Sequence, residues 1–386
     1  MALISFQLPN GTTPTVIWIF VDGRQPQEWP GGLDWFAPTW LPGPFVVFAA
    51  ADGYWDLAIP TKDVVAPGQL LLTLPALPAG GPLGWWHHAH RITRMSAQRG
   101  AGMCIGIVDE ALAPQPSTSC IAHVHNDGAA AWGSASNTRS LTPWTDHAHA
   151  VCSLMTSRAN TTQGYGGMAP YAEVFFASAC SDASSRLDVG RVEACIGHLS
   201  ETRGCEIISI SSGDLEDPSP ALQNAVDEAA DFGTLCFFAA GNRATPLYPA
   251  TYPQCLAVAA LGQRGHTPPQ TQIELIDSTQ AQLLPGHNFY VWTSSATGPE
   301  IEFCAPGVGV IWSRDYVSAA VTYGTSFACP LGAAAAALIL QNDPIYRQMS
   351  PDRQRYNYAL RVLRAAANPL GAGGNRGLWQ YGLLQL

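Results

Sequence analysis

The chain contains the stretch Gly324-Thr325-Ser326-Phe327-Ala328-Cys329-Pro330, which continues as LGAAAAALIL to Leu340. After Leu331 the residues are almost only Ala, Leu and Ile, so the stretch predicts a buried helix that is apolar on every face. Ser326 would lie in its first turn, where the helix dipole favours developing negative charge. We expect Pro330 to be tolerated because the first N–H groups of a helix have no partner. The stretch predicts a nucleophilic serine, or else a turn that caps a core helix.

Three polar residues upstream favour the nucleophile. Asp109 follows the apolar run Met103–Val108, which predicts a strand buried on both faces of a parallel sheet. His147 begins a segment whose apolar residues recur at helical spacing. Asn242 closely follows the predicted strand Leu235–Ala239. Sites in open α/β sheets gather at the carboxyl ends of the strands, so these side chains are candidates for one site.

In the order Asp109, His147 and Ser326, with Asn242 in Ala239-Ala240-Gly241-Asn242, these residues resemble the subtilisin-like serine proteases, or subtilases. The resemblance implies an enzyme, a serine endopeptidase that works through an acyl-enzyme. Ser326 would attack the peptide carbonyl, His147 would move the proton, and Asp109 would orient the histidine. The Asn242 amide and the Ser326 N–H would hold the oxyanion.

Some positions depart from the pattern of the family. Glu110 and Ala111 follow the aspartate, where the family usually has Thr or Ser and then Gly. Ala148 stands where the family has Gly. Aligning the helix on Val151 selects His147 as the catalytic histidine, with His149 as its rival. These departures motivate an alternative from another class, a catalytically weak peptide-binding protein with the subtilase fold.

The resemblance also implies a substrate-binding surface. In subtilases an edge that corresponds to Ser211, Ser212 and Gly213 pairs with the substrate backbone, which gives affinity without demanding a particular sequence. Ala240 and Gly241 would line the pocket for the side chain before the cleaved bond, and Leu247 would close its floor. We therefore expect a small or modest apolar side chain there.

The expected fold is α/β: a subtilisin-like three-layer fold with a mostly parallel central sheet, plus a small β-rich module at the N-terminus. Seven of the 12 tryptophans and 12 of the 30 prolines fall in the first 86 residues. This shift predicts an accessory domain or pro-domain at residues 1–85 and a peptidase domain at 86–386. Residues 263–287 look inserted relative to compact subtilases, and we expect a surface loop there.

Composition limits the partners of the chain. Charged residues make up 12% of its 386 residues, and the net charge is −10 with Lys62 as the sole lysine, so nucleic acid is not expected. No apolar run is long enough to span a bilayer, and Pro9 and Pro14 interrupt any signal-peptide core. We expect a cytoplasmic protein with reduced thiols, since its ten cysteines show no disulfide framework.

The proposed chemistry needs no cofactor. Calcium supports many subtilases, but no loop here shows the needed spread of oxygen ligands. Three histidines at positions 87, 88 and 90 lack Cys or carboxylate partners at ligand spacing, so no metal site is assigned. The expected partner is a peptide or protein substrate, and the sequence does not determine the oligomeric state.

A second enzymatic hypothesis is specialised peptide maturation. A cytoplasmic subtilase could remove the leader of a modified peptide, or pass the acyl group to an amine. The absence of an export signal and the unusual N-terminal module motivate this hypothesis. The substrate and the fate of residues 1–85 are not determined by the sequence.

Overall fold

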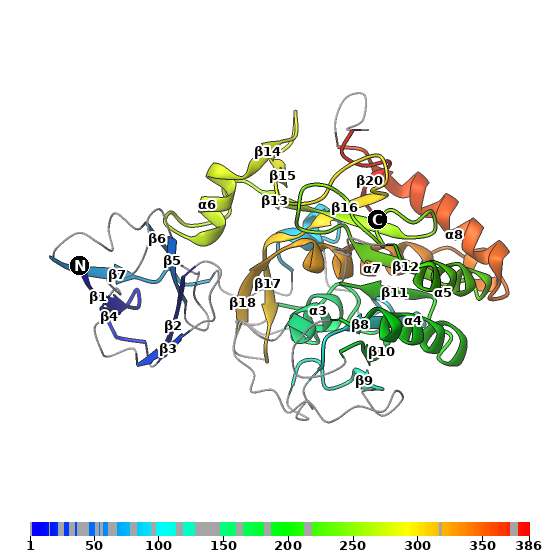
Figure 1. Cartoon of the computed structure of the whole chain (residues 1–386), viewed down its shortest axis with the longest axis horizontal. Coiled ribbons are helices and arrows are strands. Elements are labelled where there is room, and N and C mark those ends of the chain that lie inside the picture. Colours follow the sequence, from blue (N-terminus) through cyan, green and yellow to red (C-terminus); the bar gives the residue numbers. More distant parts are fainter. Residues whose placement is uncertain are drawn as a thin grey trace.

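The computed structural model describes residues 2–14, 16–21, 27–30, 35–36, 46–50, 54, 57–60, 68–77, 83–93, 98–112, 119–127, 147–159, 165–180, 187–211, 218–315, 319–370 and 377–386. In these ranges the chain forms one large sheet, two smaller sheets near the N-terminus and one hairpin (Figure 1). None of the described helices is long and apolar enough to cross a bilayer.

The large sheet is mostly parallel, as expected. Its order is β19-β20-β16-β13-β12-β11-β8-β10-β9, and only β19 with β20 is antiparallel along this path. β14 and β15 join it antiparallel beside β13. The strands are β8 (Cys104–Asp109), β9 (His125–Asn126), β10 (Glu173–Ser178), β11 (Ile207–Ile210), β12 (Leu235–Ala239), β13 (Leu256–Gln263), β14 (Ala281–Leu283), β15 (Phe289–Trp292), β16 (Phe303–Pro306), β19 (Ala367–Asn368) and β20 (Gly382–Leu384).

The strand order reverses at β8. After β8 the chain adds β10 on one side of it, and then returns to add β11 on the other side. The carboxyl ends of β8 and β11 therefore flank a topological switch point, where open α/β sheets form their binding crevices. Asp109 is the last residue of β8, and Ser211 directly follows β11.

Helices cover both faces of the sheet, as the three-layer expectation requires. One apolar cluster joins α3 (His147–Thr156), α7 (Thr325–Gln341) and α8 (Arg353–Ala366) to the sheet. A second cluster joins α4 (Val189–Gly197) and α5 (Pro220–Asp231) to the strand side chains on the other face of the sheet. The remaining helical segments are α2 (Trp85–Ala89), the π-helix η2 (His198–Thr202), α6 (Gln272–Thr279) and the 3-10 turn η3 (Tyr346–Gln348).

The all-apolar helix α7 is buried along nearly its whole length, as its sequence predicts. Gly332 lets it approach the sheet, because a Cβ there would lie 3.3 Å from a methyl group of Val258 in β13. The hairpin β17 (Val308–Ser313) and β18 (Ala319–Tyr323) leads directly into this helix.

The first strands form two small sheets, in agreement with the β-rich expectation. One has the order β4-β1-β7 and the other β3-β2-β5-β6. They consist of β1 (Ala2–Gln7), β2 (Val16–Val21), β3 (Gln27–Pro30), β4 (Trp35–Phe36), β5 (Val46–Ala50), β6 (Leu57–Pro60) and β7 (Gly68–Thr73). We call β1 to β7 the N-terminal module. It has its own small apolar cluster, and the domain boundary at residue 85 stays a prediction.

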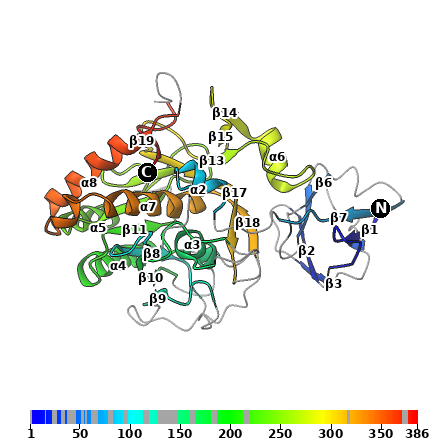
Figure 2. The same cartoon turned by 180° about the vertical axis from the view of Figure 1, so that it is seen from behind.

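The expectation of a surface loop at residues 263–287 was wrong. This segment contains α6 and β14, and Ile273 and Ile276 are buried in the same cluster as α7. We call residues 264–287 the connector segment. Along the long axis of the molecule α6 and the β17–β18 hairpin lie between the N-terminal module and the large sheet (Figures 1 and 2).

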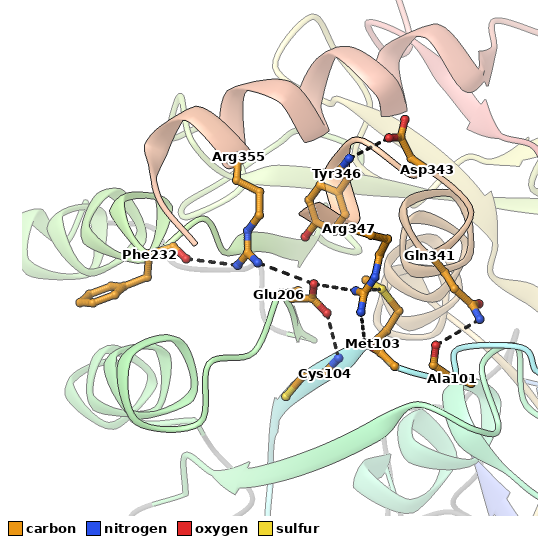
Figure 3. A network of polar contacts seen from close by, with 11 residues as sticks. Ala101, Met103, Cys104, Glu206, Phe232, Gln341, Asp343, Tyr346, Arg347 and Arg355 are labelled. Atoms are coloured by element: carbon orange, nitrogen blue, oxygen red, sulfur yellow. Dashed lines mark hydrogen bonds and ion pairs between the residues drawn. The ribbon is translucent and has the colours of Figure 1, made fainter. Parts of the chain in front are cut away.

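A polar network holds the starting ends of β8 and β11 (Figure 3). Glu206 Oε1 accepts a hydrogen bond from Arg347 Nη1 at 3.0 Å and lies 3.8 Å from Arg355 Nη1. Its other oxygen accepts from the Cys104 N–H at 3.1 Å. The carboxylate is mostly buried, so it ties η3 and α8 to both strands that end at the switch point.

Candidate active site

Asp109 and His147 lie in direct contact at the switch point. Asp109 is fully buried at the end of β8, and His147 is the first residue of α3. His147 Nδ1 lies 2.8 Å from Asp109 Oδ1, which also accepts the Glu110 N–H at 2.7 Å. Although Glu110 and Ala111 depart from the family pattern, Asp109 still lies next to His147. Such a carboxylate fixes the tautomer and orientation of an imidazole.

His149, the rival histidine, lies elsewhere. Its ring packs on Trp312 with the ring centroids 5.4 Å apart, and its side chain is almost completely buried. Burial, together with the nearby charge of Arg314, lowers the pKa of His149 to about 4. Of the two candidates, only His147 is paired with Asp109 in the structure.

Asn242 is held at the start of α7 by Thr325. The Thr325 N–H and hydroxyl both donate to Asn242 Oδ1, at 3.0 and 2.8 Å. The Thr325 hydroxyl in turn accepts the Gly241 N–H at 3.2 Å. Because the amide oxygen is fixed twice, the Asn242 amide nitrogen has a set direction. This geometry prepares a side-chain donor for an oxyanion.

Ser326 lies in the first turn of α7, as expected, but the reasoning about Pro330 was wrong. The helix begins at Thr325, so Pro330 lies beyond the first turn, where its N–H would normally bond the carbonyl of Ser326. That carbonyl accepts the Ser211 hydroxyl at 2.9 Å instead. Because Pro330 has no N–H, the Ser326 carbonyl can accept the hydroxyl of Ser211, which lies at the carboxyl end of β11.

The other predicted substrate-binding residues divide into three groups. Ser211 is buried, with its hydroxyl directed at the backbone of Ser326, while positions 212 and 213 lie outside the described residues. Ala240 and Gly241 directly follow β12, and Gly241 has a φ of 104°, which favours glycine. Leu247 is half-buried beyond Asn242. The structure leaves their role toward a substrate as a prediction.

The sequence interpretation missed two residues. Thr325 was given no role in the site, although it anchors Asn242; its position next to Ser326 was the available signal. Phe327 covers the imidazole of His147, with ring centroids 5.2 Å apart, and so brings the two helix starts together. Nothing in its immediate sequence indicates this contact, because His147 lies on another helix.

Among the described residues, no group of three His, Cys, Asp or Glu side chains is arranged to hold a metal ion. Two of the histidines near α2 have backbone partners. His87 Nδ1 accepts the Gly84 N–H at 3.0 Å, and His90 Nδ1 lies 2.6 Å from the Leu384 carbonyl oxygen.

Most of the chain is similar to known proteins. The model of the subtilase family matches residues 100–372. The minor extracellular protease Epr of Bacillus subtilis is 27% identical over 294 residues, a match that covers 74% of this chain but only 38% of that protein. Subtilisin DY of Bacillus licheniformis is 28% identical over 256 residues, which cover 64% of this chain and 79% of that protein.

Two solved structures with a similar fold are described as a self-cleaved protease domain and a maturation protease. The self-cleaved protease domain of PatA gives a TM-score of 0.53 at 23% identity and covers 74% of this chain and 94% of that chain. The prenylagaramide maturation protease PagA gives a TM-score of 0.52 at 21% identity, with 74% and 92% covered. At these identities the likeness concerns the fold.

Proposed function

The chain belongs to the subtilase family of serine proteases, and we propose that it cleaves a peptide bond at a site formed by Ser326, His147, Asp109 and Asn242. One observation carries this proposal above the others. The 2.8 Å contact between His147 and Asp109 is present at the switch point even though the sequence around both residues departs from the family pattern.

We assign the following roles to these groups. With Nδ1 bonded to Asp109, Nε2 is the ring nitrogen that takes the proton of Ser326 as its oxygen attacks the carbonyl. His147 then returns the proton to the leaving amine, and the buried carboxylate stabilises the imidazolium in between. The acyl group stays on Ser326 until water, with His147 again as base, releases it.

The oxyanion has two donors in this proposal. The amide nitrogen of Asn242 is available because Thr325 occupies its oxygen, and the Ser326 N–H lies in the first turn of α7, where helical N–H groups have no intrahelical acceptor. The mechanism needs no cofactor, since every proton transfer and charge has a side chain or backbone group assigned to it.

Labelling of the intact protein with a fluorophosphonate tests the proposal, with Ser326→Ala as the control. One adduct that maps to Ser326, absent from the alanine variant, is expected for an activated serine. No adduct on the folded protein would overturn the proposal and favour the peptide-binding alternative.

We propose peptide maturation as the more specific role. The supporting observations are the likeness to PagA, which is itself described as a maturation protease, and an N-terminal module that lies outside the matched residues 100–372. Casein and a precursor peptide encoded near the protease should be compared at equal enzyme concentration. Selective cleavage of the precursor is expected, whereas rapid general degradation of casein would refute this role.

A further inference from the structure

The N-terminal module pairs with the connector segment. Leu57 of β6 forms an antiparallel bridge with Thr271, and the Ala58 N–H donates to the Gln270 carbonyl oxygen at 2.9 Å. Leu57 and Thr271 are both buried, so this contact is shielded from solvent. β6 is the outer strand of its sheet, and the bridge extends that sheet to the residue that caps α6.

The same connector segment reaches the strand that precedes Ser326. Gln272 follows Thr271 and is only 5% exposed. Its amide nitrogen donates to the Tyr323 hydroxyl at 2.7 Å. Tyr323 ends β18 and is followed directly by Gly324, Thr325 and Ser326.

Both ends of this contact are firmly packed. Ile273 is buried against β17, where a Cβ on Gly309 would lie 2.9 Å from its methyl group. The ring of Tyr323 meets Trp292 edge to face with centroids 5.6 Å apart. A well-packed interior transmits displacement rather than absorbing it. A change at Gln272 should therefore move the end of β18.

Only Gly324 separates Tyr323 from Thr325, which anchors Asn242. The Gly324 N–H donates to the Gly307 carbonyl at 2.7 Å, and its φ of 139° fixes a sharp entry into α7. We propose that Gln272 is a positioning residue for the hydrolytic site, and that the N-terminal module keeps Gln272 in place by pairing with the connector segment. This inference rests on the proposed function and makes the module a retained part of the working enzyme.

A set of variants separates positioning from mere stability. Gln272→Met keeps the size but removes the donor, whereas Gln272→Glu restores the contact because Tyr323 can donate to the carboxylate. We expect Gln272→Met and Tyr323→Phe to lower kcat and the rate of fluorophosphonate labelling about tenfold with KM unchanged, and Gln272→Glu to recover most of the loss.

The matched control is Asp277→Asn in the same connector segment. Asp277 pairs with the half-exposed Arg264 at 3.0 Å, so this variant should label at the rate of the wild type. Wild-type rates in Gln272→Met and Tyr323→Phe, with the wild type itself labelled, would overturn the inference and leave the proposed function intact. An unlabelled wild type would refute the proposed function instead.

Ala58→Pro tests the role of the module. Its N–H points to Gln270 rather than to β5, so proline on this outer strand removes the Ala58–Gln270 hydrogen bond and leaves the hydrogen bonds to β5 in place. Ala58→Gly keeps the N–H and serves as the control. We expect Ala58→Pro to lower labelling about tenfold, and the double variant with Gln272→Met to fall no further.

A folded Ala58→Pro variant that labels as fast as Ala58→Gly would overturn the role of the module. If Ala58→Pro does not fold, the wild type is tested instead at increasing urea concentrations, with pulse proteolysis to follow unfolding of the N-terminal module. Fluorophosphonate labelling should decline at the same urea concentrations at which the module loses its protection from the protease. Full labelling after the module has become cleavable would refute the inference.

Discussion

Thr325→Val is the most direct perturbation of the proposed oxyanion site. Thr325 is fully buried, and valine has nearly the same shape, so the change removes the hydroxyl with little repacking. The hydrogen bond of 2.8 Å to Asn242 Oδ1 is lost, and the Gly241 N–H loses its acceptor at 3.2 Å. The Thr325 N–H, at 3.0 Å, still holds the amide oxygen.

The expected magnitude lies between two limits. Complete loss of an oxyanion donor lowers kcat by about 10²–10³. One neutral hydrogen bond contributes about 0.5–1.5 kcal/mol, and about 1.4 kcal/mol corresponds to a factor of ten in rate. Since one of the two anchors of Asn242 remains, we expect kcat of Thr325→Val to fall about tenfold with little change in KM.

The assay is steady-state hydrolysis of a peptide substrate, with Thr325→Ser and Asn242→Ala measured beside it. Thr325→Ser keeps the hydroxyl and should stay near the wild type, while Asn242→Ala should lose about 10²–10³ in kcat. The reasoning is refuted if Thr325→Val turns over at the wild-type rate, or if Thr325→Ser loses as much activity as the valine variant.

Three further predictions concern histidines and the polar network. His147→Ala should lower kcat by about 10⁶, whereas His149→Phe should leave kcat near the wild-type value; equal losses in hydrolysis assays would contradict the assignment. Burial lowers the pKa of His90 from its ordinary value of 6.5 to about 4, so the unfolded chain binds the proton first and stability falls as the pH drops through this window. Between pH 7 and pH 5 the free energy of unfolding in urea should fall by about 2 kcal/mol more for the wild type than for His90→Asn. Equal falls in both proteins would show that His90 is not the cause. Glu206→Gln should lower the free energy of unfolding by about 2–3 kcal/mol, less than for a fully buried pair because Arg347 is partly exposed; an unchanged urea midpoint would argue against the network.

The sequence predicted the parts of the fold in which local pattern and burial agree. β12 spans Leu235–Ala239 as its apolar run indicates, and β8 ends at Asp109. Both strands are buried on two faces, so hydrophobicity is continuous and the strand ends are sharp. His147 begins α3 for a similar reason, because the helical spacing of apolar residues starts there.

Contacts between distant segments were beyond this kind of reasoning. The two buried isoleucines of the connector segment stand in a mostly polar stretch, so the segment resembles a loop until its packing partner is known. The anchoring of Asn242 by Thr325 joins residues 83 positions apart. The preference for His147 over His149 came from aligning Val151 with the family pattern, whereas the contact of His147 with Asp109 is known only from the structure.

The missing N–H of Pro330 also has a consequence for how this sequence can diverge. With any residue other than proline, position 330 would supply a helical N–H to the Ser326 carbonyl, and that carbonyl would no longer depend on the Ser211 hydroxyl for a hydrogen-bond partner. We therefore expect substitutions of Ser211 that remove the hydroxyl to be tolerated only in homologues that have another residue in place of Pro330. The two positions, far apart in the chain, should covary across the lineage as a linked pair.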